Sequence, residues 1–569
     1  MVRHCVWAAT LGLVIGGAAA VADESRTAAL TVHDDVLHTI DVRLFGQFLE
    51  RASFGDHGPE AFVDARTGRL PDRIVAMLKG MEIPIIRFPG GTDVDYIDWR
   101  DMIDNVPGRD GPRPVTRSFR PGRDEPFTIT NRFGYDEYFA LRDELKCQTI
   151  LVVNLLDGLA KRRPLDEAAR LAAGLVAYAN APVGAALPEG MPDWPAVRAA
   201  NGHPAPFKAE FVQIGNEIFL GTVRDQVAEA TGLATPEALA AWYVEVYTAY
   251  VRAIRAVDPN VQIIIDAWLG GPISQTVHAD PAIKANVAYL ACHRYAPGAC
   301  NQVFRGDGKV DVATVSDEQL WWAWTSMPGA VDAAGQNQAY ADSIDAARRQ
   351  GYLLASTEWN WNGWSWQGLT DSFDAPAASG LGAAAFLHGL MRQGGDIRLA
   401  TQSMLLGRGW SFASVFADPT GKHPPYYTPQ GSATLFCRRH HGPSLLRSEL
   451  TGVRTHPQPY RFGWGGGVDH EPAELDVLVT ADAGRVFIHA INRTFDRDLP
   501  LRIDLSALGA VGAAGTHHRL TFGPHAEEGL GVSQGVARIS AAPIAAAVRM
   551  TVMLPARTVS IIEVPRTKE

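Results

Sequence analysis

Two glutamates in this sequence stand where a carboxylate could take part in a reaction. Glu217 closes residues 213–217 (QIGNE), and Glu358 lies within residues 356–360 (STEWN). Retaining glycoside hydrolysis needs two carboxyl groups about 5–5.5 Å apart, one to protonate the leaving oxygen and one to attack the anomeric carbon. Unequal surroundings can raise the pKa of one carboxyl group and keep the other ionised. The pair therefore favours cleavage of a glycosidic bond.

Further polar residues end other apolar runs of the chain. They are Glu50, Arg87, Asn154, Asn216, His293, Tyr295 and Gln402. A polar side chain in such a place is often only a helix cap or an ion-pair partner, so none of them identifies a site alone. Because unpaired buried charge is costly, several such residues at one edge of a sheet would indicate a functional site.

Tryptophan is frequent, with 14 residues, and four of them follow Glu358 closely. They are Trp359, Trp361, Trp364 and Trp366. Indole rings suit flat apolar sugar faces as well as protein cores. We expect at most one or two of the four to stack on a sugar and the others to be core residues.

The apolar runs that carry these residues alternate with amphipathic stretches. The predicted strands are residues 42–49, 83–88, 149–154, 211–214, 261–267, 287–293, 352–357 and 397–404. Predicted helices between them include residues 70–81, 134–146, 165–180, 236–257 and 343–350. Strand–helix alternation predicts a parallel sheet with crossover helices. Eight strand candidates favour an α/β fold of the (β/α)8 TIM-barrel type over residues 38–440, with the active site at the carboxyl ends of the strands.

The last part of the chain has a different pattern. From about residue 445, short alternating runs separated by turn residues replace the helical periods. These runs are residues 475–480, 485–492, 499–505, 518–522, 549–554 and 558–564. The pattern is typical of a small antiparallel β-sandwich, which we assign to residues 445–569. A strand within residues 28–37 precedes the barrel and is predicted to join this domain.

The first residues have the pattern of a secretory signal peptide. Arg3 and His4 give a basic start, an apolar run follows, and Ala20 or Ala22 suits a cleavage site. A membrane anchor is the alternative, but the run is shorter than the ~20 residues that span a bilayer. We expect cleavage of residues 1–22, no membrane span in the mature protein, and a secreted or periplasmic location.

Composition limits the partners that the protein could bind. The net charge is −10, which argues against nucleic acid because that partner needs a dense Lys/Arg face. A carbohydrate partner is compatible with this charge. No CxxC or HExxH motif is present, so we expect no protein-built metal site and no cofactor. Cys292 and Cys300 are close enough in sequence for a disulfide, with two free thiols as an equal alternative.

In several stretches the sequence resembles glycoside hydrolase family 51, the α-L-arabinofuranosidase family of a wider clan of retaining (β/α)8 enzymes. The most specific stretch is residues 201–207 (NGHPAPF), which leads into residues 214–217 (IGNE). Other matching stretches are residues 45–50 (FGQFLE), 87–91 (RFPGG), 130–137 (TNRFGYDE) and, more weakly, 400–402 (ATQ). The resemblance implies a TIM barrel with a β-sandwich companion domain.

The resemblance also implies a role for each matching residue. Glu217 would be the acid/base and Glu358 the nucleophile, with Tyr295 positioning the nucleophile by a hydrogen bond. The residues expected to hold the first sugar or line its site are Glu50, Arg87, Asn216, His293 and Gln402. Thr92 stands where the family usually has Asn after Pro-Gly-Gly and is expected to bind the sugar there. Asp93 and Asp95 are candidates to replace the contact that the shorter threonine side chain loses.

We therefore predict an exported retaining glycoside hydrolase that cleaves arabinofuranoside-type pentose linkages in a polysaccharide or oligosaccharide. One alternative keeps the chemistry and changes the substrate, as in a pyranosidase or endo-glycanase of the same clan; an open cleft would indicate it. Another alternative is a non-catalytic carbohydrate-binding barrel, which is disfavoured because both carboxylates are present. The sequence does not address the oligomeric state.

Overall fold

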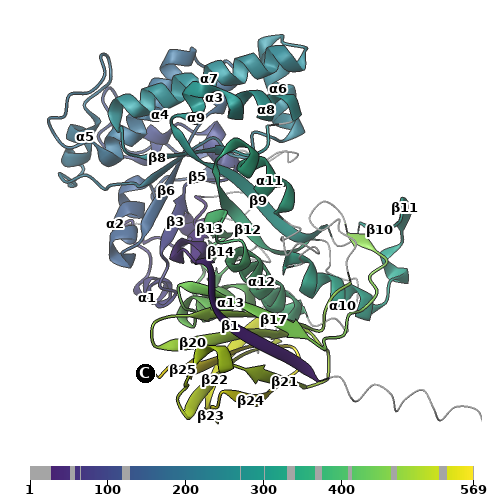
Figure 1. Cartoon of the computed structure of the whole chain (residues 1–569). Helices are drawn as coiled ribbons and strands as arrows, with labels where there is room; N and C mark the ends of the chain where they lie inside the picture. The colour runs from purple at the N-terminus through teal and green to yellow at the C-terminus, as the bar shows by residue number, and fades with distance from the viewer. Residues whose placement is uncertain are drawn as a thin grey trace, which may run out of the picture.

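The computed structural model describes two joined parts, a barrel and a curled β-sheet domain (Figure 1). The described residues are 27–51, 58–64, 66–117, 128–269, 271–299, 302–329, 340–364, 375–407, 413–462, 471–524 and 535–567. The signal peptide predicted at residues 1–22 lies outside them. Cys300 also lies outside them, so the disulfide between Cys292 and Cys300 stays a prediction. Among the described helices, none is both long enough and apolar enough to cross a membrane.

Eight strands in the described part of the chain close into a barrel whose neighbouring strands are all parallel. They are β2 (Gly46–Phe48), β3 (Ile85–Phe88), β6 (Gln148–Val153), β7 (Phe211–Ile214), β8 (Gln262–Asp266), β9 (Val287–Ala299), β12 (Leu353–Trp364) and β13 (Ile397–Ser403). Each one overlaps a predicted strand, which confirms the TIM barrel. Strand β2 is shorter than predicted because the Asp41 side chain caps a 3-10 turn, η1 (Val42–Phe45).

Helices surround the barrel and follow its strands. They are α1 (Asp72–Gly80), α2 (Tyr135–Leu145), α3 (Leu156–Leu159), α4 (Leu165–Asn180), α5 (Trp194–Ala200), α6 (Gly221–Thr231), α7 (Pro236–Val257), α8 (Gly271–Ala279), α9 (Pro281–Lys284), α10 (Asp317–Ser326), α11 (Ala341–Gln350), α12 (Ala375–Arg392) and α13 (Pro429–Arg439). Helix α7 shows why the local sequence forms a helix. Thr235 caps its first turn by accepting from the Ala238 N–H, and proline at the first position fits the missing donor.

Apolar side chains fill the inside of the barrel. Ile85, Ile150, Ile264 and Leu399 are buried together there, with Phe211 at the start of β7. These residues lie nearer the amino ends of their strands, while the polar strand-end residues lie nearer the carboxyl ends. The packed interior therefore supports a polar site at the other end, as is usual for this fold.

The C-terminal domain is one hydrogen-bonded sheet of nine strands among the described residues, in the order β23-β22-β25-β20-β19-β17-β1-β21-β24. Their bounds are β1 (Ala28–Thr39), β17 (Ser444–Thr451), β19 (Leu475–Ala481), β20 (Arg485–Asn492), β21 (Leu499–Asp504), β22 (Ala514–Pro524), β23 (Gly535–Ala545), β24 (Arg549–Leu554) and β25 (Thr558–Pro565). Strand β1 pairs antiparallel with β17 and parallel with β21. The sheet curls around a core that includes Leu30, Val479, Ile488 and Ile562.

Sequence patterning did not predict strand β23. Its residues are rich in alanine and include Pro543, and both features lower strand propensity. Strand β23 lies at one edge of the sheet, where a proline costs no ladder hydrogen bond on its open side.

Shorter paired strands complete the description. They are β4 (Thr116–Arg117), β5 (Thr128–Ile129), β10 (Val303–Arg305), β11 (Gly308–Val310), β14 (Leu406–Gly407), β15 (Val415–Phe416), β16 (Tyr426–Tyr427) and β18 (Arg461–Phe462).

Helices α12 and α13 separate the barrel from the sheet domain (Figure 1). Tryptophans from the barrel side are buried in the apolar cluster at this seam, including Trp361, whose indole N–H donates to the Trp324 carbonyl at 2.9 Å. Trp359 is also fully buried and packs against Phe386. These two tryptophans are therefore core residues and do not stack on a sugar. The side chains of Trp364 and Trp366 lie outside the described part of the chain.

Candidate active site

Three polar side chains meet at the carboxyl end of the barrel. A carboxylate oxygen of Glu217, a carboxylate oxygen of Glu358 and a ring nitrogen of His293 all lie within 4.8 Å of one another. Glu217 follows strand β7, His293 belongs to β9 and Glu358 to β12. Retaining glycosidases hold their two carboxyl groups about 5–5.5 Å apart, whereas inverting enzymes need about 6.5–9.5 Å. The spacing in this structure fits the retaining arrangement.

Glu358 is buried and held by two hydrogen-bond donors. Arg87 Nη1 donates to its Oε1 at 2.9 Å, and the Tyr295 hydroxyl donates to its Oε2 at 2.7 Å. Burial alone would raise the pKa of Glu358, but the charges of His293 and Arg87 and the hydrogen bond from Tyr295 outweigh it and lower this pKa below its ordinary value. Glu358 is therefore an ionised, oriented carboxylate at neutral pH.

Arg87 is itself fixed by neighbouring strands. Its Nε donates to Gln213 at 3.0 Å, its Nη2 donates to Asn216 Oδ1 at 2.6 Å, and its guanidinium lies 4.4 Å from the centre of the Phe48 ring. All these contacts are to protein groups, and the side chain is completely buried. Arg87 thus supports Glu358 directly, and its predicted contact with the sugar stays a prediction.

Glu217 is the more exposed of the two glutamates. Its side chain is 22% exposed, compared with 8% for Glu358. His293 Nδ1 lies 2.9 Å from Glu217 Oε1, and His293 Nε2 lies 3.0 Å from Thr357 Oγ1. Burial lowers the pKa of His293, but the charges of Glu358 and Glu217 outweigh burial and raise it. A protonated His293 donates to both partners and so orients the Glu217 carboxyl group.

Two further carboxyl groups clamp the backbone around Glu217. Glu217 has a φ of 50°, in the left-handed region, which is costly for a residue with a Cβ. Asp95 accepts the Asn216 N–H at 3.0 Å on one side, and Asp266 accepts the Ile218 N–H at 2.8 Å on the other. Burial raises the pKa of Asp95 to about 6 and that of Asp266 to about 7.

The clamp role of these two aspartates was not predicted from the sequence. Asp266 ends strand β8, and no site residue was predicted on this strand. The signal was available, because the predicted site residues were also recognised as polar residues at strand ends. Asp95 carries no such signal, because it lies within the 3-10 turn η3 (Thr92–Tyr96). It also accepts the backbone N–H groups of Leu155 and Leu156. Asp95 is therefore occupied by backbone groups and does not reach the sugar in place of the family's asparagine.

The predicted alternative, Asp93, is occupied as well. It forms a buried ion pair with Arg51 at 2.5 Å. Thr92, which begins η3, is half-buried. The expectation that one of the two aspartates reaches the sugar is therefore wrong, since tertiary contacts bind both carboxylates elsewhere.

A glycine pair lets Glu50 approach the strand-end residues. Gly91 has a φ of 78°, and a Cβ at this position would lie 1.6 Å from Glu50 Oε1. Only glycine tolerates both the conformation and the close approach.

Asn216 adds a polar group near Arg87, and its amide nitrogen is buried with no hydrogen-bond partner among the described residues. A sugar hydroxyl or a water that accepts this hydrogen bond would satisfy the donor.

Two partly exposed aromatic residues that sequence reasoning missed also lie at this end of the barrel. The Phe219 ring centre is 5.4 Å from that of Trp268 and 6.4 Å from that of His293. The guanidinium of Arg294 lies 3.8 Å from the Trp268 ring centre. Phe219 and Trp268 follow strand ends closely in the sequence, and this position could have marked them as site candidates. Phe219 and Trp268 offer apolar ring surface of the kind that packs against sugars.

Two of the strand-end residues serve the scaffold. Gln402 is fully buried, and its amide oxygen accepts from Gln47 and Thr434 while its amide nitrogen donates to Asn360. This position does not support the predicted contact between Gln402 and the sugar. Asn154 accepts the Asp157 N–H at 3.0 Å, which is a helix-capping contact.

The stretch with the strongest family resemblance lies outside the site. Asn201 Nδ2 donates to Tyr178 and Asp136, and the Phe207 ring stacks on Phe139 with centres 4.3 Å apart. These contacts hold the layer of helices outside the barrel. Asn201 and Phe207 therefore make packing contacts and none of the contacts that build the candidate site.

Comparison with known proteins gives consistent matches. A family model described as the alpha-L-arabinofuranosidase 1 domain matches residues 77–297. The intracellular exo-alpha-(1->5)-L-arabinofuranosidase of Streptomyces lividans is 24% identical over 85% of this chain and 67% of its own length. The enzyme of the same name from Bifidobacterium longum is also 24% identical, over 86% of this chain and 82% of its own length.

Solved structures show the same architecture. The alpha-L-arabinofuranosidase from Thermotoga maritima, in complex with arabinose, superposes with a TM-score of 0.68 at 20% identity, covering 95% of this chain and all of that one. The GH51 arabinofuranosidase from Xanthomonas axonopodis pv. citri gives a TM-score of 0.67 at 16% identity, covering 95% of this chain and 99% of that one. The sequence and structure matches together support an arabinofuranosidase-like glycoside hydrolase.

Proposed function

We propose that the chain is a retaining glycoside hydrolase of family 51 that cleaves α-L-arabinofuranosyl linkages, with Glu358 as nucleophile and Glu217 as acid/base. The observation that carries the proposal is the pair of carboxylates within 4.8 Å of each other in unequal surroundings. Glu358 is buried beside the side chains of Arg87 and His293, and Glu217 is the more exposed. The names of the relatives and the family 51 label of several solved structures support the sugar and the family.

In the first step a Glu358 oxygen attacks the anomeric carbon as the bond from this carbon to the leaving oxygen breaks. Glu217 gives its proton to the leaving oxygen, so an alcohol departs and a glycosyl ester of Glu358 remains. Arg87 and Tyr295 hold the attacking carboxylate in place before the step. This preorganisation lowers the cost of reaching the transition state.

In the second step water replaces the ester. Glu217, now a carboxylate beside His293, takes a proton from a water molecule whose oxygen attacks the anomeric carbon, and Glu358 leaves as a carboxylate. One water molecule is consumed, and two inversions give net retention of configuration.

The groups that could bind the sugar are fewer than the family pattern implies. The Asn216 amide nitrogen, which has no partner among the described residues, is placed to bind a sugar hydroxyl, and the family resemblance implies the same role for Glu50. Thr92 offers one hydroxyl where the family's asparagine offers both a donor and an acceptor. Because Asp93 and Asp95 are bound elsewhere, we infer that simple α-L-arabinofuranosides are poor substrates and that a related sugar or a longer chain is preferred.

A substrate panel tests the activity. The enzyme is assayed on aryl α-L-arabinofuranoside, aryl β-D-xylopyranoside, aryl β-D-glucopyranoside and soluble arabinan, and proton NMR follows the first-formed anomer. Hydrolysis of furanosides with retained configuration supports the proposal. Hydrolysis of pyranosides alone would favour the same-clan alternative, and first release of the inverted anomer would contradict the double displacement.

Thr92→Asn tests the inference about specificity. Leaving a sugar hydroxyl unpaired costs about 1–3 kcal/mol. We therefore expect kcat/KM on aryl α-L-arabinofuranoside to rise about tenfold in the variant. A wild type that is already efficient on this substrate, and a variant that is slower, would contradict the inference.

We also propose that the protein is exported, on the basis of the leader pattern at residues 1–22. The names of the Streptomyces lividans and Bifidobacterium longum relatives describe them as intracellular, so location is a point on which this chain would differ. Expression of the full chain in a bacterial host, fractionation and N-terminal sequencing test this directly. A mature protein that begins near residue 23 supports export, and an uncleaved cytoplasmic chain contradicts it.

A further inference from the structure

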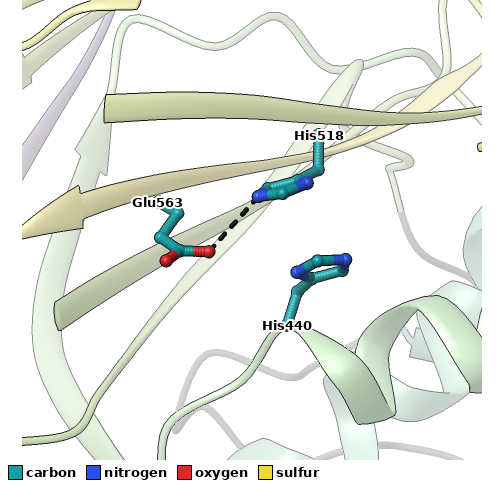
Figure 2. Close-up of side chains that lie close together, drawn as sticks. All are labelled: His440, His518 and Glu563. Atoms are coloured by element: carbon teal, nitrogen blue, oxygen red, sulfur yellow. Dashed lines mark hydrogen bonds and ion pairs between the residues drawn. The ribbon is translucent and has the colours of Figure 1, made fainter. Parts of the chain in front are cut away.

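A second cluster of ligand-type side chains lies at the seam between the barrel and the sheet domain (Figure 2). His440 directly follows helix α13, His518 belongs to strand β22 and Glu563 to strand β25. Their ligand atoms all lie within 4.8 Å of one another. His518 Nε2 is 3.2 Å from Glu563 Oε2, and the two imidazole rings face each other with centres 3.9 Å apart. The cluster is half-buried.

The spacing and the atom types suit a divalent transition metal. Zinc binds imidazole nitrogen and carboxylate oxygen at about 2.0–2.2 Å in a tetrahedron, whose edge is then roughly 3.3 Å. The distance from His518 to Glu563 matches this edge. Imidazole ligands select zinc-type ions over magnesium and calcium, which prefer oxygen. We propose that His440, His518 and Glu563 bind one zinc-type ion that ties the barrel to the sheet domain.

The place of His440 in the fold favours this role. His440 is the C-cap of helix α13. The carbonyl end of a helix carries partial negative charge, which favours a cation there.

Arg485 orients the carboxylate of the cluster without occupying the proposed ligand atom. Its Nη1 lies 3.3 Å from Glu563 Oε1, whereas His518 faces Oε2. Such a contact from outside the site fixes a ligand in place. The positive charges of Arg485 and of Arg439, next to His440, oppose a bound cation. We therefore expect a modest affinity, which one ligand substitution should abolish at micromolar metal.

The site could not be found from the sequence. Its three ligands come from distant parts of the chain, with no short spacing motif between them. The inference therefore departs from the expectation of no protein-built metal site, which rested on motifs alone. Three protein ligands leave a fourth position for water. The site joins two domains and lies apart from the two catalytic candidates, so its role is structural.

The test uses the full chain, treated with EDTA, dialysed and titrated with Zn²⁺ alone. Bound metal is measured by competition with a chromogenic chelator, and Tm is measured with and without Zn²⁺. We expect one Zn²⁺ per chain and a higher Tm. Loss of an outer partner already weakens metal binding by roughly tenfold or more, so His440→Ala and Glu563→Gln should each weaken it at least that much.

Two reference variants make the test specific. His33 forms a comparable surface pair with Glu449 at 3.3 Å but has no third ligand within the described residues, so His33→Ala should bind Zn²⁺ like the wild type. Glu217→Gln should also keep the binding, because the metal is not at the barrel mouth. Zn²⁺ binding that is lost in Glu217→Gln and kept in His440→Ala would overturn the proposal. No Zn²⁺-dependent rise in Tm beyond that of a His440→Ala/His518→Ala double variant would also overturn it.

Discussion

Two regions of the molecule hold histidine and glutamate side chains in similar triplets, with different consequences. At the barrel mouth His293 lies between Glu217 and Glu358, and the two carboxylates raise its pKa. At the seam His440 faces a second histidine and Glu563, and burial and His518 lower its pKa.

The comparison shows that residue type alone does not decide what such a triplet does. The two nearby glutamates raise the pKa of His293, which favours its protonated form, and Arg87 adds a positive charge beside Glu358. At the seam, burial and the neighbouring His518 outweigh the single glutamate and lower the pKa of His440. Burial and local charge balance therefore shift the histidines of the two triplets in opposite directions.

The test with the largest expected effect replaces one glutamate of each triplet by alanine. Glu358→Ala should abolish turnover on both activated and natural substrates, because no covalent intermediate can form; the loss should be on the order of 10⁴-fold or more. Glu563→Ala is the matched control and should retain wild-type kcat. Measured kcat on an aryl glycoside decides, and substantial turnover by Glu358→Ala would contradict the assignment of the nucleophile.

The next largest effect depends on the leaving group. Glu217→Ala removes the proton donor, so natural substrates with poor leaving groups should lose about 10²–10⁴-fold in rate. Activated aryl glycosides need little protonation and should retain much more of their rate of ester formation. The comparison is made on kcat/KM for the two substrate types. Equal losses on both would show that another residue is the acid.

A smaller effect concerns pH and the surroundings of Glu358. Tyr295→Phe removes a hydrogen bond that lowers the pKa of Glu358, so this pKa should rise. Glu358 must be ionised, and activity is lost as pH falls through its pKa, so the acid limb of kcat/KM should move to higher pH. We expect a loss of roughly tenfold in kcat/KM, the scale of one hydrogen bond to a charged group. Tyr289→Phe is the control, because Tyr289 lies on the same strand, β9, nearer its amino end. An acid limb that does not move in Tyr295→Phe would argue against a role of Tyr295 in lowering the pKa of Glu358.

The smallest expected effect is on stability, through the Glu217 clamp. Burial raises the pKa of Asp266 from 3.8 to about 7, so between these values the native state holds more protons than the unfolded state. The free energy of unfolding therefore decreases as pH rises across this range. Asp266→Asn keeps an acceptor for the Ile218 N–H and removes the titration.

Measured by Tm across the same pH range, Asp266→Asn should lose this decrease and gain stability relative to wild type as pH rises. Asp266→Ala leaves the buried N–H unpaired and should be less stable by about 1–3 kcal/mol at every pH. A constant difference in Tm between wild type and Asp266→Asn would show that Asp266 does not titrate in this range.

Much of the architecture could be predicted from the sequence. The eight barrel strands were found because buried parallel strands are continuous apolar runs, and polar residues at their ends marked Glu217, His293, Tyr295 and Glu358, which the structure brings together. Strand β23 was missed because its propensity is low. The catalytic roles of these residues and the domain limits stay predictions until the variants are measured.

The sequence by itself determined the repeating pattern of the chain, because apolar periodicity is a local property that follows from strand and helix geometry. Only the tertiary structure decided the partners of individual side chains. In the tertiary structure Asp95 accepts backbone N–H groups, and Gln402 hydrogen-bonds to buried protein groups. Trp359 and Trp361 are buried, and His440 lies close to Glu563. The physical reason is that contacts and pKa values depend on distances through space, which barrel closure and domain packing set between residues far apart in the chain.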